Sequence, residues 1–186
     1  MWKSVGRIMA VVVVAAGALW LATFGSFEQE VRQSVEGGYP LPQFRLPVLE
    51  SSLFEGDTTF LESGELRGKV AILAFWATWC SPCIAEQPSL LALQDEFGED
   101  GFVLVGVLHE ERPQRALEWL QENDRLEFRT VVGSRAFALD SGVGGLPNTI
   151  LVDRHGTVTE LFLGYWPERD AYLRDAVRQL LREEAD

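Results

Sequence analysis

Cysteine is scarce in this sequence: of 186 residues, only Cys80 and Cys83 are cysteine. Two cysteines within one Cys-x-x-Cys motif provide no disulfide scaffold, so a hydrophobic core has to hold the fold together. Histidine is equally scarce, with His109 and His155 as its two occurrences. Because there is no second Cys-x-x-Cys pair, a four-ligand zinc site would need both histidines. We interpret both histidines as loop residues, which disfavours a zinc site.

Basic residues are also few, with 16 Lys and Arg against 28 Asp and Glu, so the formal net charge is −12. The first 37 residues contain three of each sign, which leaves 13 basic and 25 acidic residues in the remainder. A domain this acidic argues against binding to nucleic acid and against adhesion to anionic lipid. We interpret the charge as a solvated acidic surface. The sequence has neither a low-complexity segment nor an internal repeat.

One long apolar run stands out at residues 8–27, which contain no charged side chain. About 20 such residues suffice to span a bilayer as a helix. Lys3 and Arg7 precede the run, and Glu28 and Glu30 follow it. The positive-inside rule then places the N-terminus in the cytoplasm and the Cys-x-x-Cys motif across the membrane.

A cleaved signal peptide is the alternative for this run. Against it, the run is long and no clear Ala-x-Ala cleavage site follows. We therefore expect a single-pass transmembrane anchor at residues 1–27 and a polar linker at 28–38. One folded domain should occupy residues 39–186.

The two cysteines lie between a predicted buried strand at 70–76 and a predicted helix at 84–97. Pro82 falls near the first helical position, where its fixed φ helps to start the turn. At a helix start, unpaired N–H groups and the helix dipole favour a thiolate, which is the attacking species in disulfide exchange. We assign Cys80 as the nucleophile and Cys83, one turn deeper, as the resolving thiol.

A purely structural disulfide is another alternative for Cys80 and Cys83. A ring this small removes little chain entropy from the unfolded state and so adds little stability. A redox-active pair is therefore the favoured interpretation.

The surrounding residues carry a family resemblance. The string FWATWCSPC at 75–83 resembles the active-site signature of thioredoxin-fold proteins. Its continuation CIAEQP at 83–88, and PLPQFRLP at 40–47, resemble the membrane-anchored TlpA/ResA/DsbE (CcmG) branch. That branch implies a thiol:disulfide oxidoreductase that faces an extracytoplasmic space and reduces partner proteins during cytochrome c maturation.

The rest of the chain alternates in the thioredoxin order. The patterns predict a return strand at 58–61, strands at 102–108, 149–152 and 157–163, an extended piece at 129–132, and helices at 113–122, 134–139 and 168–183. A turn at 153–156 should join the last two strands. Strand–helix–strand followed by a hairpin and a helix predicts an α/β, thioredoxin-like fold, with a central mixed sheet flanked by helices.

The loop GGLPN at 144–148 precedes a predicted strand. It resembles the thioredoxin loop whose proline is cis and faces the disulfide, which implies a cis Leu146–Pro147 bond. There the backbone of Leu146 can pair with an extended substrate segment, and Pro147 presents no N–H to the sulfurs. Asn148 departs from the glutamate or threonine often found after that proline, so it supports no prediction of specificity.

Glu86 occupies the position of a glutamate typical of this branch and lies one helical turn from Cys83. We interpret it as a proton acceptor or donor that tunes the resolving thiol; the alternative is an ordinary solvated glutamate. Ala74 stands where thioredoxins carry a buried aspartate, which leaves Glu86 as the remaining acid. We expect Trp76 in the core and Trp79, with Pro82, on the rim that meets a partner.

The predicted reaction is reduction of a partner disulfide by the dithiol form, without a metal or cofactor. The resemblance implies apocytochrome c, through its Cys-x-x-Cys-His motif, as substrate. It also implies a transmembrane DsbD/CcdA-type carrier as reductant, and an inner-membrane location with the domain facing the periplasm. Two alternatives are a reductant of a copper-site assembly protein and a non-catalytic metal carrier that uses both cysteines and a histidine.

Overall fold

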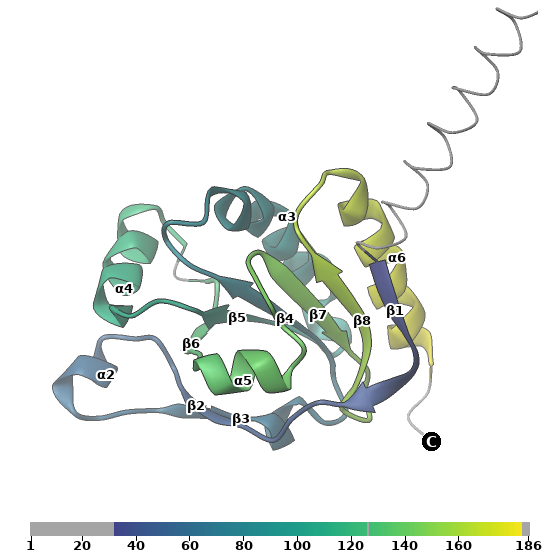
Figure 1. The fold of residues 1–186 in the computed structure, drawn as a ribbon, viewed down its shortest axis with the longest axis horizontal. Coiled ribbons are helices and arrows are strands. Elements are labelled where there is room, and N and C mark those ends of the chain that lie inside the picture. Colours follow the sequence, from purple (N-terminus) through teal and green to yellow (C-terminus); the bar gives the residue numbers. More distant parts are fainter. Residues whose placement is uncertain (1–31, 126, 184–186) are drawn as a thin grey trace, which may run out of the picture. The chain divides into compact units, whose positions relative to one another are not determined.

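The computed structural model describes residues 32–183 apart from residue 126 (Figure 1). Residues Ser34–Asp186 belong to one compact unit. The predicted anchor at 1–27 and the first part of the predicted linker lie outside the described residues. Within the described residues, no helix combines the length and apolar character needed to cross a membrane.

Six strands form one mixed sheet in the order β1-β8-β7-β4-β5-β6 (Figure 1). Strand β4 pairs in parallel with β5, which pairs in parallel with β6, whereas β7 is antiparallel to both β4 and β8. The strands are β1 (Arg32–Pro40), β4 (Val70–Trp76), β5 (Phe102–Leu108), β6 (Thr130–Val132), β7 (Asn148–Val152) and β8 (Thr157–Leu163). Every residue of β4 is buried, as its uninterrupted apolar sequence predicts.

Two hydrophobic clusters pack on the two faces of the sheet. One contains Leu90, Leu120 and Leu173, which come from α3 (Ser81–Phe97), α4 (Pro113–Glu122) and α6 (Glu168–Arg182). The other contains Phe137 of α5 (Arg135–Asp140), together with Leu46 and Leu61. The thioredoxin-like α/β fold is thereby confirmed.

A small two-stranded sheet lies between β1 and β4 in the chain and contains the predicted return strand. Strand β2 (Arg45–Pro47) pairs antiparallel with β3 (Phe60–Glu62). The remaining short elements are α2 (Ser52–Glu55) and the 3₁₀ turns η1 (Ser63–Leu66) and η2 (Gly98–Asp100). The sequence did not predict α2, and none of its residues is buried, so it leaves no amphipathic pattern to detect.

Two boundaries differ from the predictions by more than two residues. Strand β1 begins at Arg32, inside the segment predicted as a polar linker at 28–38, so part of that segment is an edge strand of the sheet. Helix α3 begins at Ser81 rather than at residue 84. The earlier start follows from Pro82, which tolerates the first helical turn because no intrahelical partner is available there for an N–H.

Four loops meet at the edge of the sheet that is formed by the carboxyl ends of its parallel strands. Strands β4, β5 and β6 run in parallel and end there, and the antiparallel β7 begins there. The loops at 77–80, 109–112, 133–134 and 144–147 therefore lie at the same edge. In open α/β sheets, ligand sites form beyond the carboxyl ends of parallel strands, and both cysteines lie at this edge.

Candidate active site

The two cysteines form a disulfide at the start of α3, with their Cα atoms 5.3 Å apart. Cys80 is the N-cap residue, and its Sγ accepts a hydrogen bond from the backbone N–H of Cys83 at 3.3 Å. The exposed fraction is 5% for Cys80 and 0% for Cys83. Cys83 is therefore fully enclosed, whereas a small part of the Cys80 residue remains accessible to solvent.

Trp79 and Trp76 lie as the sequence predicts. Trp79 is 66% exposed beside the disulfide, whereas Trp76 is 1% exposed in the core. The loop between them is held by Glu110, whose Oε2 accepts hydrogen bonds from the N–H of Thr78 at 3.2 Å and from its hydroxyl at 2.8 Å. Glu110 was not among the predicted site residues, because its partner lies 32 positions away in the chain.

The second loop of the site carries the cis Leu146–Pro147 bond that the family resemblance implies. The position of this loop follows from the pairing of β7 with β4, in which Asn148 lies opposite Phe75. The carbonyl of Pro147 accepts a hydrogen bond from Gly164 at 2.9 Å. Within the described part of the chain, the backbone groups of Leu146 form no hydrogen bond, which leaves them without a partner in the protein.

Glu86 lies inside the protein, with 1% of its surface exposed. Its Oε2 lies 2.7 Å from Arg169 Nη2, which donates a hydrogen bond to it, and the two side chains form an ion pair. Arg169 is itself 1% exposed, and it also donates to the Thr149 hydroxyl at 3.4 Å and to the Gly164 carbonyl at 3.2 Å. The alternative of an ordinary solvated glutamate at position 86 is therefore wrong.

Burial raises the pKa of Glu86 to about 7, because a carboxylate removed from water loses hydration energy. The charge and hydrogen bond of Arg169 act in the opposite direction and keep the pKa from rising further. A carboxyl group in this range can both take up and release a proton near neutral pH.

Arg169 was missed in the sequence analysis, although a pattern could have revealed it. It lies four residues before Leu173 and eight before Val177, so the three residues share one face of α6. All three are buried. An arginine on the buried face of a helix needs an internal counter-charge, and this requirement points to an acidic residue elsewhere in the core.

The histidines are found in loops, as expected. His109 follows β5, and His155 lies in the β7–β8 turn, where its N–H donates to Asp153 Oδ1 at 2.9 Å. Across residues 32–183, apart from 126, no three His, Cys, Asp or Glu side chains are grouped so that they could hold a metal ion.

Comparison with known proteins assigns the family. Residues 37–180 match the Redoxin family. DsbE of Pseudomonas fluorescens biotype C, a thiol:disulfide interchange protein, is 35% identical over 130 residues, covering 68% of this chain and 66% of that protein. The thiol-disulfide oxidoreductase ResA of Halalkalibacterium halodurans is 30% identical over 179 residues, covering 96% of this chain and 93% of ResA.

A solved structure agrees with this assignment. The crystal structure described as a thiol:disulfide interchange protein DsbE from Chlorobium tepidum superposes with a TM-score of 0.69 at 26% identity, over 77% of this chain and 96% of that one. The chain therefore belongs to the Redoxin family and is a thioredoxin-like thiol:disulfide oxidoreductase similar to DsbE and ResA, with Cys80 and Cys83 as its Cys-x-x-Cys pair.

Proposed function

We propose that the dithiol form of this protein reduces disulfides of partner proteins, with Cys80 as the nucleophile. The observation that carries this proposal is that Cys80, the N-cap residue, keeps some solvent exposure, whereas Cys83 is fully buried. The Cys80 thiolate attacks one sulfur of the partner disulfide, forms a mixed disulfide and releases a partner thiolate. Cys83 then attacks Cys80 Sγ, which closes the internal disulfide and releases the second partner thiolate. Two electrons pass to the partner.

Glu86 serves the second step in this proposal. Residues three apart on a helix lie on the same face, so Glu86 is a neighbour of Cys83 on α3. Before Cys83 can attack, its thiol has to lose a proton, and the site provides a buried carboxylate for it. Arg169 is the positioning residue, because its 2.7 Å contact orients that carboxylate.

Leu146, Trp79 and Pro82 form the partner-binding rim in this proposal, and Pro147 lies next to Leu146. The backbone of Leu146 pairs with an extended segment of the partner, as in strand addition. Pro147 follows it and presents no N–H to the sulfurs. Trp79 and Pro82 flank the disulfide on the helix side, where the exposed indole provides apolar contact area.

The client and location proposed for the domain follow from the family. We propose that it reduces the Cys-x-x-Cys-His motif of apocytochrome c, and that a transmembrane DsbD/CcdA-type protein supplies its electrons. Residues 1–27 would anchor it in the cytoplasmic membrane, with the catalytic domain on the outer side. The alternative client is a copper-site assembly protein, which would undergo the same exchange chemistry.

An exchange assay tests the client. Reduced full-length protein is mixed with oxidised Cys-x-x-Cys-His peptides from cytochrome c and, separately, with oxidised peptides of a copper-site assembly protein. We expect faster reduction of the cytochrome peptide. Equal rates would remove the cytochrome assignment, and a faster reaction with the copper-site peptide would favour the alternative. Absence of reduction in both would overturn the reductase function.

Replacing Glu86 by glutamine should alter the pH dependence of turnover. Because the pKa of Glu86 is about 7, the carboxylate that accepts the proton forms as pH rises through 7, and the rate of the wild-type protein should rise with it. Glu86→Gln should lack this rise and resolve the mixed disulfide about 100-fold more slowly at pH 8, a typical loss for a general base.

The matched control is Glu96→Gln, because Glu96 lies on the same helix but pairs with Arg174 at the surface. Its pH profile should follow that of the wild type in stopped-flow measurements of mixed-disulfide decay. An unchanged profile in Glu86→Gln would remove the acid–base role.

A further inference from the structure

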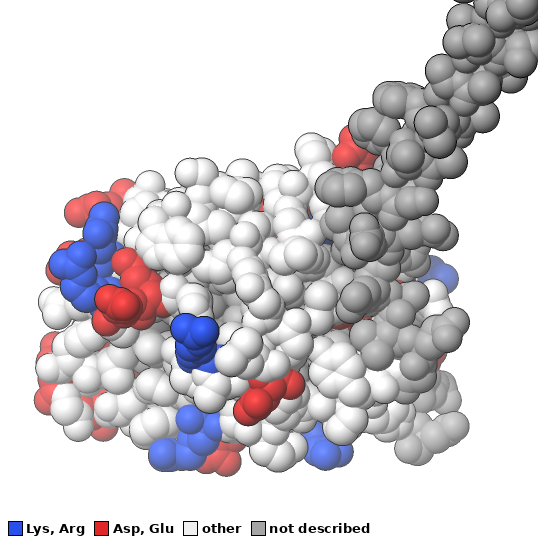
Figure 2. All heavy atoms as spheres, viewed as in Figure 1, with Lys and Arg blue, Asp and Glu red and all other residues white. Residues whose placement is uncertain are grey.

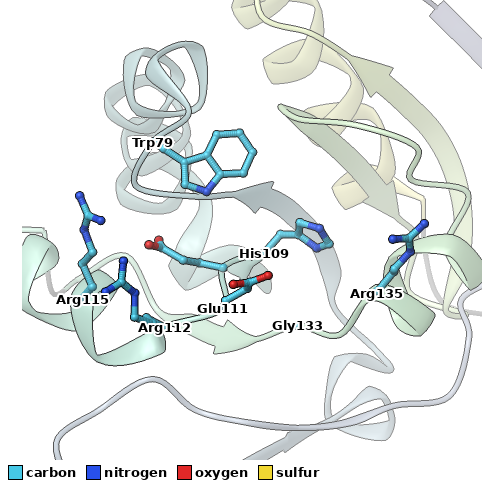
Figure 3. A pocket seen from close by; sticks show the side chains of 8 residues that line it. Trp79, His109, Glu111, Arg112, Arg115, Gly133 and Arg135 are labelled. Carbon is cyan, nitrogen blue, oxygen red and sulfur yellow. The ribbon is translucent and has the colours of Figure 1, made fainter.

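A cleft of about 460 Å³ opens beside Trp79, on the side away from α6 (Figure 3). The loop after β5, the first turn of α4 and the start of α5 form its walls. Its lining residues are Trp79, His109, Glu110, Glu111, Arg112, Arg115, Gly133 and Arg135. Because Trp79 immediately precedes Cys80, any partner whose disulfide reaches Cys80 lies at the border of this cleft.

Three arginines in this cleft have no acidic partner among the residues that the structure describes. Arg112 and Arg115 lie together at one end of the cleft, and Arg135 lies at the other (Figure 3). Within residues 32–183, apart from 126, their guanidinium groups form no ion pair and no hydrogen bond. Elsewhere on the surface, Arg45 contacts Glu62 at 3.1 Å and Arg174 contacts Glu96 at 2.9 Å, whereas the exposed Arg129 and Arg182 form no ion pair with a described residue.

The acidic residues of the cleft do not cancel this charge. The Glu110 carboxylate is engaged by the N–H and hydroxyl of Thr78, which leaves Glu111 as the other acid among the lining residues. Three arginines against two glutamates give the lining a net positive charge, although the whole protein carries −12. On the face shown in Figure 2, basic and acidic side chains lie side by side at the left and lower rim of a broad uncharged surface.

A smaller apolar hollow of about 150 Å³ continues from the cleft toward Leu146. His109 and Arg135 line both hollows, so the two are adjacent. Leu139, which is 59% exposed, also lines the smaller one. A segment bound along Leu146 would therefore meet apolar surface first and arginine side chains further along.

We propose that the arginine cleft selects partner segments that carry Asp or Glu side chains within a few residues of the target disulfide. This inference rests on the proposed reductase function and adds a preference among its clients. Charge complementarity carries it, because a carboxylate would provide the counter-charge that Arg112, Arg115 and Arg135 lack within the described chain. The expected preference for acidic peptides is opposite to the effect of the overall charge of −12, which would by itself repel them.

Peptide reduction at low ionic strength tests the proposal. Three oxidised peptides share one Cys-x-x-Cys disulfide and carry flanking Glu, Gln or Lys residues. We expect reduced full-length protein to react about tenfold faster with the Glu peptide than with the Gln peptide, as two exposed ion pairs would give. Added salt should reduce the preference, because these charges are exposed.

Two double variants locate the effect. Arg112→Gln/Arg115→Gln should lose most of the preference for the Glu peptide, while its rate with the Gln peptide stays unchanged. Arg174→Gln/Arg178→Gln removes the same charge far from the cleft and should retain the preference. Equal rates with Glu and Gln peptides, or equal losses in both double variants, would overturn the proposal. A protein that reduced none of the peptides would instead contradict the reductase function.

Discussion

Full-length protein carrying Cys83→Ser should accumulate covalent adducts with its natural partner, and Cys80→Ser should form none. The reason is the division of roles between Cys80, which keeps some solvent exposure, and Cys83, which is fully buried. Without Cys83 the Cys80 thiolate still attacks a partner disulfide, but no internal thiol remains to resolve the product. Both variants should lose catalytic turnover completely.

The adducts can be measured directly in cells. Proteins are trapped with acid, separated without reductant, and identified after release with dithiothreitol. Cys80→Ser is the matched control, because it removes one sulfur from the same helical turn. Adducts that form in Cys80→Ser and not in Cys83→Ser would reverse the assignment, and adducts in neither variant would refute disulfide exchange by this pair.

The second large effect is expected on stability, from Arg169→Met. This substitution leaves the carboxyl group of Glu86 buried without its cation, and breaking a buried ion pair in this way costs about 3–5 kcal/mol. Arg174→Met removes an exposed ion pair with Glu96 and should cost no more than about 1 kcal/mol. Urea unfolding of the oxidised full-length proteins measures the difference in the free energy of unfolding.

The loss in the free energy of unfolding caused by Arg169→Met should depend on pH. The folded-state pKa of Glu86 is raised to about 7, so its protonated form is favoured in the fold and stability falls as pH rises through that value. Removing Arg169 raises this pKa further, because it removes the opposing charge. The destabilisation by Arg169→Met should therefore be larger at pH 8 than at pH 6.

A compensating variant separates the ion pair from simple packing. Glu86→Leu/Arg169→Met removes both charges and should recover most of the stability lost in Arg169→Met, since no unpaired carboxylate remains. If Arg169→Met were no less stable than Arg174→Met, the buried pair would have no energetic role. If the double variant were less stable than Arg169→Met, shape rather than charge would explain the loss.

How well the sequence predicted each feature depends on how far apart the interacting residues lie in the chain. The Cys-x-x-Cys motif, Pro82 and the strand before them are local features, and the helix start they imply was predictable within three residues. Trp79 was correctly placed on the surface and Trp76 in the core. The cis bond before Pro147 was implied by a short loop motif and is present.

The environment of Glu86 was not predictable in the same way. The sequence suggested its position on the helix but left open whether it was solvated. Its partner Arg169 lies 83 residues away on another helix, and only the packing of α3 against α6 brings them together. The position of Arg169 on the face of Leu173 and Val177 was the one available indication.

Sequence alone determined that this chain has an exchange-competent cysteine pair at a helix start, because helix geometry and dipole act over only a few residues. Tertiary structure alone decided that Glu86 is buried against Arg169, and that Arg112, Arg115 and Arg135 share a cleft beside Trp79. The physical reason is that burial and charge pairing depend on distances in space, and the order of strands in the sheet sets those distances.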